Sequence, residues 1–265
     1  MSTAIRAGSP APATNPARGG GFAGAVGAEW TKLWSIRTPY VCLLVGLLVT
    51  VIFCYYYGAI SEINDKPIQP VGNAPVSAVI LTQFAVLVLA MTMVTSEYAT
   101  SSVRTSLMWV PVRHRVQLAK ALVGSVVGFV LGIVYSVIGV ALAWSPFQGH
   151  ASFDMSKVTA QVLAVGVYCA LVGVMSVGVA FALRTAAATV AVLFFIISAL
   201  PSMLTGLGGD FLLVLNDYMP QTAGGVFMLG KDNAPYSPMG GLLIVVVWAV
   251  ASHVVGTYVL RKRDA

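Results

Sequence analysis

The residues of this chain that could do chemistry are few, and their spacing matches no common reaction centre. The sequence holds no GxxxxGK[ST] loop, no HExxH, no GxSxG and no paired carboxylates inside an apolar stretch. The glycine-rich stretch at 21–27 lacks the following lysine that a phosphate-binding loop requires. Cys42, Cys54 and Cys169 lie in apolar runs without metal-ligand spacing, which indicates buried, inert thiols. We therefore expect no enzymatic activity from this chain itself, no bound cofactor and no metal site.

Three polar side chains lie within long apolar stretches: Gln83, Gln161 and His253. Such residues usually form hydrogen bonds to neighbouring helices of a membrane bundle. A proton relay is the alternative, but a relay normally needs an acidic partner inside the membrane, and the centres of these stretches contain none. The pattern favours a structural role.

The composition places the chain in a membrane. Of its 265 residues, 58% are hydrophobic and only 9% are charged, against roughly 25% charged residues in soluble domains. Crossing a hydrocarbon core of ~30 Å takes about 20 helical residues. Six stretches meet this length: 40–60, 76–95, 119–143, 158–182, 186–205 and 241–260. The sequence thus predicts an all-α, multi-pass integral protein of the cytoplasmic (plasma) membrane.

The distribution of Lys and Arg predicts the orientation of the six helices. Only residues 183–185 separate the fourth helix from the fifth, so these two form an antiparallel hairpin. With both termini in the cytoplasm, the cytoplasmic segments hold twelve of the fifteen basic residues: Arg6, Arg18, Lys32, Arg37, Arg104, Arg113, Arg115, Lys120, Arg184, Arg261, Lys262 and Arg263. The other three are Lys66, Lys157 and Lys231. The net charge of +6 is therefore a topology signal, and it does not predict a nucleic-acid partner.

The pattern predicts three regions along the chain. We expect residues 1–21 to be a disordered cytoplasmic tail, residues 22–38 an interfacial helix and residues 39–263 a single six-helix transmembrane domain. The tail is rich in Ala, Pro, Gly, Ser and Thr and has no apolar core, so it is not a signal peptide.

The interfacial helix is predicted from apolar residues at helical spacing: Phe22, Val26, Trp30 and Leu33. Glu29 and Lys32 fall off this stripe. An amphipathic helix with tryptophan on its apolar face suits the inner membrane surface. It should end before Thr38–Pro39, since the residue before a proline avoids the helical region. The alternative is a simple positive anchor ahead of the first span.

The segment 96–118 connects the second and third spans. Its apolar residues Val103, Leu107 and Val110 lie among Ser, Thr and Arg, and Pro111 follows them. This pattern predicts a short, partly apolar helix that a soluble partner could bind in the cytosol. The alternative is an ordinary basic loop in which Glu97, the only acid of the segment, forms one structural ion pair.

The external loop 206–240 contains two apolar pieces, 211–215 and 226–229, which are too short to span a membrane. Asp217, Pro220 and the pair at 224–225 separate them. This pattern fits two re-entrant or interfacial helices that cap the outer side, with a plain exposed loop as the alternative.

Glycines recur at every fourth position in the third span, at Gly124, Gly128 and Gly132. This small-residue ridge allows another helix to approach closely. The partner helix could belong to the same subunit or to a second copy in a dimer.

Together these pieces resemble the permease subunits of type-2 ATP-binding-cassette exporters, particularly the compact actinobacterial form. The resemblance is carried by AEWTKLWSIRT at 28–38, SEYATSSVRTSLMWVPVRHRVQLAK at 96–120 and MPQTAG at 219–224. The architecture matches from about residue 22 to 263, whereas specific local matching is confined to the first two pieces.

The resemblance implies a role for each piece. The connecting helix and the coupling helix would contact an ATPase through Glu29, Trp30, Lys32, Glu97, Tyr98, Arg104, Thr105 and Leu107. The external gate would include Asp217, Pro220 and Gly224.

The resemblance also implies the partners and the activity. Two ATP-binding-cassette ATPase subunits, which would carry ATP and Mg, would dock on a permease homodimer embedded in membrane lipid. The complex would export an amphiphilic substrate (a drug, a peptide or a lipid-like molecule). The alternative is an ion- or proton-coupled secondary transporter, which would need midplane charges or helices broken at matching places in two halves.

Overall fold

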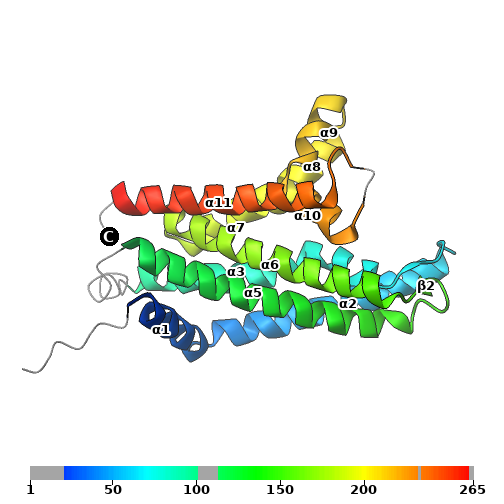
Figure 1. The fold of residues 1–265 in the computed structure, drawn as a ribbon, viewed down its shortest axis with the longest axis horizontal. Helices are drawn as coiled ribbons and strands as arrows, with labels where there is room; N and C mark the ends of the chain where they lie inside the picture. The colour runs from blue at the N-terminus through cyan, green and yellow to red at the C-terminus, as the bar shows by residue number, and fades with distance from the viewer. Residues whose placement is uncertain (1–20, 101–112, 232–233, 263–265) are drawn as a thin grey trace, which may run out of the picture.

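The computed structural model describes residues 21–100, 113–231 and 234–262, and these residues are almost wholly helical (Figure 1). Within them, six segments are long and apolar enough to cross a membrane. Five are single helices: α2 (Thr38–Ile63), α3 (Asn73–Ala99), α5 (Arg113–Trp144), α6 (Met155–Leu183) and α11 (Pro238–Lys262). The remaining one, the fifth along the chain, runs through α7 (Ala186–Phe194), a π-helical turn η1 (Phe195–Ala199) and α8 (Leu200–Leu207). The prediction of six helices able to span a membrane is confirmed, and each predicted span lies inside one of these segments.

Local sequence signals explain where several helices begin and end. Helix α1 (Gly21–Ser35) is separate from α2, because Pro39 in the first turn of α2 lacks the N–H that a continuous helix would use. The Asp154 side chain accepts hydrogen bonds from the backbone amides of Ser156 and Lys157 and so caps the start of α6. Helix α6 ends at Arg184, whose left-handed backbone (φ 62°) turns the chain into α7. The predicted break before Pro39 is confirmed.

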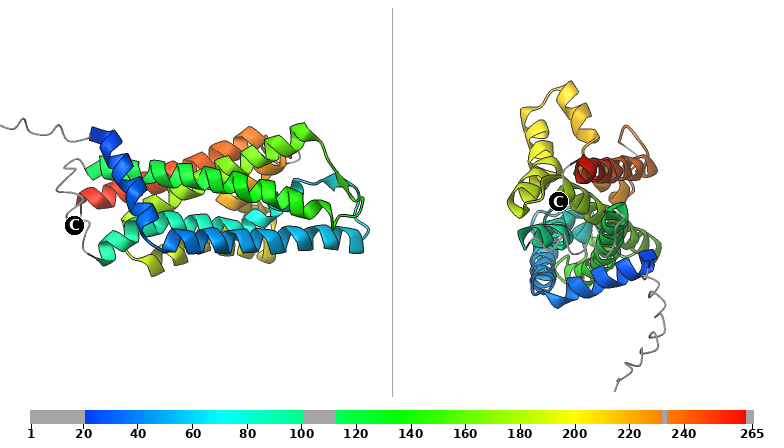
Figure 2. Two further views of the ribbon diagram at one scale, coloured as in Figure 1. Left: turned by 90° about the horizontal axis from the view of Figure 1, so that it is seen from below. Right: turned by 90° about the vertical axis from the view of Figure 1, so that its left-hand side faces the viewer.

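The long helices lie side by side, and α1 crosses one end of the bundle (Figure 2). We call this the α1 end and the opposite one the distal end. The start of α5, the end of α3 and the end of α11 lie at the α1 end. At the distal end, β1 (Gln69–Pro70) and β2 (Ala151–Ser152) form a two-residue parallel bridge between two loops. The tail predicted for residues 1–21 lies outside the described residues except for its last position.

Helices α3 and α6 form the centre of the bundle. Two thirds of the most apolar stretch of each is buried, against less than a third for α2, the α7–α8 segment and α11. Their inward faces join one core that includes Leu87, Met91, Val172 and Phe181. The less buried helices therefore present the surfaces that lipid or another subunit would cover.

The glycine ridge of α5 lies against α6 of the same chain. A Cβ atom on Gly128 would lie 2.7 Å from the carbonyl oxygen of Cys169, and one on Gly132 would lie 2.8 Å from the Cα of Gly166. At Gly124 the nearest atom would be 3.5 Å away, an ordinary contact. The tight approach is thus confined to the distal two thirds of the ridge.

The connection between the fifth and sixth segments is helical. Helix α9 (Asp210–Asp217) follows α8 away from the bundle, and α10 (Pro220–Leu229) returns to pack against α6 and α11 (Figure 1). The two apolar pieces predicted at 211–215 and 226–229 lie in these helices. Gly224, however, does not separate them. It lies inside α10 against Tyr168, where a Cβ atom would come within 2.2 Å of the ring, so this glycine serves helix packing.

The close α5–α6 packing generates a stability prediction. Gly128→Ala should lower the apparent melting temperature in detergent, because the new methyl group overlaps the α6 backbone, at a cost of about 1–3 kcal/mol. Gly124→Ala on the same helix is the matched control and should be neutral or stabilising, since alanine favours a helix by ~1 kcal/mol over glycine. Equal melting temperatures for the two variants would contradict the described packing.

Candidate functional site

Four charged side chains meet at the α1 end and form what we call the charge cluster. Glu29 and Lys32 come from α1, Glu97 from the last turn of α3 and Lys120 from the second turn of α5. The Lys120 Nζ lies 2.5 Å from Glu29 Oε2 and 2.9 Å from Glu97 Oε1. The Lys32 Nζ lies 2.8 Å from Glu29 Oε1 and 2.9 Å from the same Glu97 oxygen. Two lysines thus bridge the same two carboxylates, and the cluster has no formal net charge.

The cluster is asymmetric in its burial. The Lys120 side chain is only 1% exposed and Glu29 only 5%, whereas Lys32 is 46% exposed. Lys120 also donates to the backbone carbonyl of Met93 at 2.8 Å, so its three ammonium donors have three acceptors. Lys120 is the buried centre of the cluster, and Lys32 is the member that reaches the protein surface.

The protonation of Lys32 follows from its position at this edge. Partial burial by itself lowers the pKa of Lys32, but hydrogen bonds and charges from Glu29 and Glu97 outweigh it and raise the pKa above its ordinary value of 10.5. A raised lysine pKa stabilises the folded state fully below pH 10.5, and this contribution is lost only as the pH rises through the raised value. Lys32 is therefore charged at neutral pH.

The structure brings together three of the residues for which the resemblance implies contact with an ATPase. Glu29, Lys32 and Glu97 all belong to the charge cluster, and of these Lys32 is the one substantially exposed. Glu29 does not belong to the apolar stripe predicted for 22–37, yet in the structure it is buried on the same face of α1 as Leu33. Trp30 is 45% exposed on α1.

Tyr98, also assigned to coupling, lies beside α6. Its ring packs edge-on against Phe181, and the Arg184 guanidinium lies 5.3 Å from the ring centroid. The turn between α6 and α7 therefore contacts the end of α3. The other residues to which the resemblance assigns coupling, Arg104, Thr105 and Leu107, lie outside the described residues, as does the short helix predicted around them.

Lys120 was not among the predicted site residues. Its sequence signal is a single lysine within the apolar run LAKALV at 118–123, and it is the eighth residue of a spanning helix. A lone buried lysine requires an acidic partner, and Glu97 is the nearest acid in sequence. In the Lys and Arg distribution Lys120 indicates only the orientation of the helix, and that distribution says nothing of its ion pairs.

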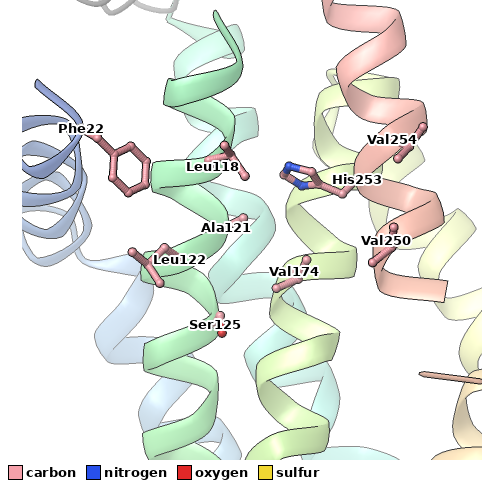
Figure 3. A pocket seen from close by; sticks show the side chains of 9 residues that line it. All are labelled: Phe22, Leu118, Ala121, Leu122, Ser125, Val174, Val250, His253 and Val254. Atoms are coloured by element: carbon pink, nitrogen blue, oxygen red, sulfur yellow. The ribbon is translucent and has the colours of Figure 1, made fainter. Parts of the chain in front are cut away.

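An apolar groove of about 460 Å³ runs between α5 and α11 near the α1 end, and we call it the lateral groove (Figure 3). Phe22 of α1 contributes to its wall, and Val174 of α6 lies between the two flanking helices. The His253 ring points from α11 toward α5. Gln117, which is fully buried, donates to the His253 carbonyl oxygen at 2.9 Å and accepts from Thr257 at 2.9 Å, which ties α5 to α11.

At the distal end, α10 is held by neutral hydrogen bonds. Gln83 of α3 accepts from the Tyr168 hydroxyl of α6 at 2.7 Å and donates to Gln221 of α10 at 3.1 Å. Ser198, in the π-helical turn, also donates to Gln221 at 3.1 Å. Of the predicted gate residues, Asp217 ends α9 while Pro220 and Gly224 lie in α10, which places them beside this network.

The described residues contain no group of three His, Cys, Asp or Glu side chains that could hold a metal ion. No protein-family model matches the chain, and a search of curated proteins finds no significant match.

The charge cluster predicts unequal effects of its two lysines. Lys120→Met should lower the free energy of unfolding by about 3–5 kcal/mol, because it leaves an uncompensated charge on buried glutamates. Lys32→Met should cost only about 1 kcal/mol, since this side chain is half exposed. Thermal unfolding of the purified variants in detergent measures both.

The double variant Lys120→Met/Glu97→Gln restores charge balance and should recover part of the stability lost by Lys120→Met. If the double variant were as unstable as the sum of the two single variants, the four side chains would not act as one cluster.

Proposed function

We propose that this chain is the transmembrane permease subunit of a type-2 ATP-binding-cassette exporter, driven by a separate ATPase. In this proposal the α1 end faces the cytoplasm, α1 lies along the inner membrane surface and residues 206–240 form a re-entrant outer gate. Two copies of the chain form the translocation unit, and each docks one of two ATPase subunits. The proposal extends the resemblance of residues 28–38 and 96–120 to the whole molecule.

The observation that carries the proposal is the attachment of α1 to both sides of the segment 101–112. Glu29 binds Lys120 at the start of α5, and Lys32 binds Glu97 at the end of α3. An ATPase that moves either α1 or the segment 101–112 would therefore act on α3 and α5 together. Coupling of this kind needs a rigid connection at the docking side, and buried ion pairs provide one because separating them costs several kcal/mol.

The same geometry gives a simple transport cycle. ATP binding would bring the two partner subunits together, and the attached α1–α3–α5 unit of each permease would move with them. The partner would thereby change the balance between inward- and outward-facing states. The neutral hydrogen bonds that hold α10 at the distal end can exchange at lower cost than the ion pairs, which suits a gate.

The surfaces of the bundle support an amphiphilic cargo. The lateral groove is apolar apart from His253 and Ser125, and it opens between two spans beside the amphipathic helix. In the described spans, every Asp, Glu, Lys and Arg lies within eight residues of a helix end. An ion-coupled transporter would need such a charge near the membrane centre.

The orientation can be tested by cysteine labelling, since the three native cysteines are buried. A membrane-impermeant maleimide added to intact cells should label Asn64→Cys at the distal end, and it should label His114→Cys at the α1 end only after lysis. Both positions are exposed. Labelling of His114→Cys in intact cells would overturn the proposed orientation.

The coupling role can be tested by co-purification with the candidate ATPase encoded nearest to this chain. Arg104→Ala/Leu107→Ala should reduce ATPase recovery and the stimulation of hydrolysis by at least about tenfold, since two central contacts of an interface are typically worth over 1 kcal/mol each. The control Lys66→Ala/Leu207→Ala also removes one basic residue and one leucine, but at the distal end, and should change neither. Unchanged recovery and hydrolysis in the first variant would refute the coupling assignment.

A further inference from the structure

A second cavity lies at the distal end, far from the charge cluster. It encloses about 760 Å³ between α6, α10, the start of α11 and the loop before α3, and we call it the distal pocket. Two of its lining residues are cationic, Lys157 and Lys231, and none of its described lining residues is acidic. They are two of the three basic residues that the sequence places on this side of the protein.

The lining changes in polarity along the axis of α6. Lys157 lies in the first turn, Gln161 one turn deeper, and Leu163 and Val167 deeper still. From Lys157 to Val167 this gradient covers about 15 Å at 1.5 Å per residue. Phe227 of α10 lines the opposite wall. The positive charge lies at the helix end, where a lipid has its headgroup. The apolar lining lies deeper in the span, where a lipid has its acyl chains.

Local structure fixes both lysines at the mouth of the pocket. Lys157 is the third residue of α6, and its backbone amide and that of Ser156 donate to the Asp154 carboxylate that caps the helix. Lys231 follows the left-handed Gly230, and their amides bond to the carbonyls of Val226 and Phe227 in a Schellman arrangement. Neither lysine forms an ion pair within residues 21–100, 113–231 and 234–262. Both residues are exposed, so each can meet an anion at the pocket.

Gln161, in the polar part of the lining, has an acceptor that the described residues do not use. Gln161 is 7% exposed and donates through Nε2 to Asn73 Oδ1 at 2.9 Å. Its Oε1 is buried and has no hydrogen-bond partner within the described residues. This oxygen lies against Gly72, since a Cβ atom on that glycine would come within 2.0 Å of it. A ligand hydroxyl can satisfy the acceptor once the Gln161 amide turns toward the pocket, which removes the cost of a buried acceptor without a donor.

We propose that the distal pocket binds one anionic phospholipid, with its phosphate between Lys157 and Lys231, a headgroup or glycerol hydroxyl near Gln161 and an acyl chain against Leu163 and Phe227. The pocket's charge, its polarity gradient and its unused acceptor each match one part of such a molecule. The proposal rests on these residues alone and needs no ATPase, so its test is independent of the coupling assignment.

The test uses the full-length protein in phosphatidylcholine nanodiscs that contain a few per cent of phosphatidylglycerol with a photoactivatable diazirine on one acyl chain. After illumination, mass spectrometry should find adducts on the α6 and α10 peptides that line the pocket. Lys157→Gln/Lys231→Gln should reduce these adducts about tenfold or more, because each lysine near an anionic lipid is worth about one kcal/mol. Lys66→Gln removes the third distal lysine, which lies over the Tyr57 ring, and should leave the yield unchanged.

A second pair of variants tests the apolar part without changing charge. Ala160→Trp fills the pocket and should abolish the adducts, whereas Thr159→Trp at the adjacent exposed position, which does not line the pocket, should preserve them. Equal labelling by a diazirine phosphatidylcholine probe, insensitive to the lysine variants, would overturn the proposal in favour of nonspecific lipid contact. Full competition by millimolar glycerol phosphate would overturn it in favour of a simple anion site.

Discussion

The architecture of the α1 end depends on one constraint, which is that charges removed from water must be paired. Lys120 is buried inside a membrane-spanning helix, so its position is tolerable only where carboxylates reach it. Glu97 comes from the neighbouring span, but Glu29 has to be supplied by a helix outside the spans. The need to neutralise Lys120 therefore fixes where α1 lies. Any force applied to α1 therefore reaches α3 and α5 through these ion pairs.

The two ends of the bundle use different chemistry for the same task of joining helices. At the α1 end the links are ion pairs with buried partners, and losing one partner leaves a charge in a low-dielectric environment. At the distal end the links to α10 are amides and hydroxyls, such as Gln83 with Tyr168 and Gln221 with Ser198. A neutral hydrogen bond is worth about 1 kcal/mol net, so the distal end can rearrange at lower cost. The π-helical turn that carries Ser198 adds a local irregularity at this point of the fifth span, and such turns frequently occur at functional sites.

Several features of the fold could be predicted from local sequence patterns and single residues. Hydropathy located all six spans, and Pro39 predicted the separation of α1 from α2. The glycine spacing in α5 predicted a close helix approach but left its partner open, because the same ridge suits α6 or a second copy. Gly224 shows the limit of such reasoning. A glycine pair in a loop-like sequence predicted a break, whereas the Tyr168 ring requires that glycine inside a helix.

The sequence by itself determined that the helices suit a lipid environment, how many spans there are and how long they are, and that the basic residues group at one end. These properties follow from residue-by-residue transfer between water and lipid, which depends on composition and local spacing. Only the tertiary structure decided that Glu29 and Glu97 share Lys120, that α10 is tied to Gln83 and that two distal lysines border one pocket. Those outcomes depend on which helix faces which, and residues more than 60 positions apart meet only after the bundle has packed. Catalytic motifs are short and local, whereas the charge cluster, the hydrogen bonds of α10 and the distal pocket are made at contacts between helices.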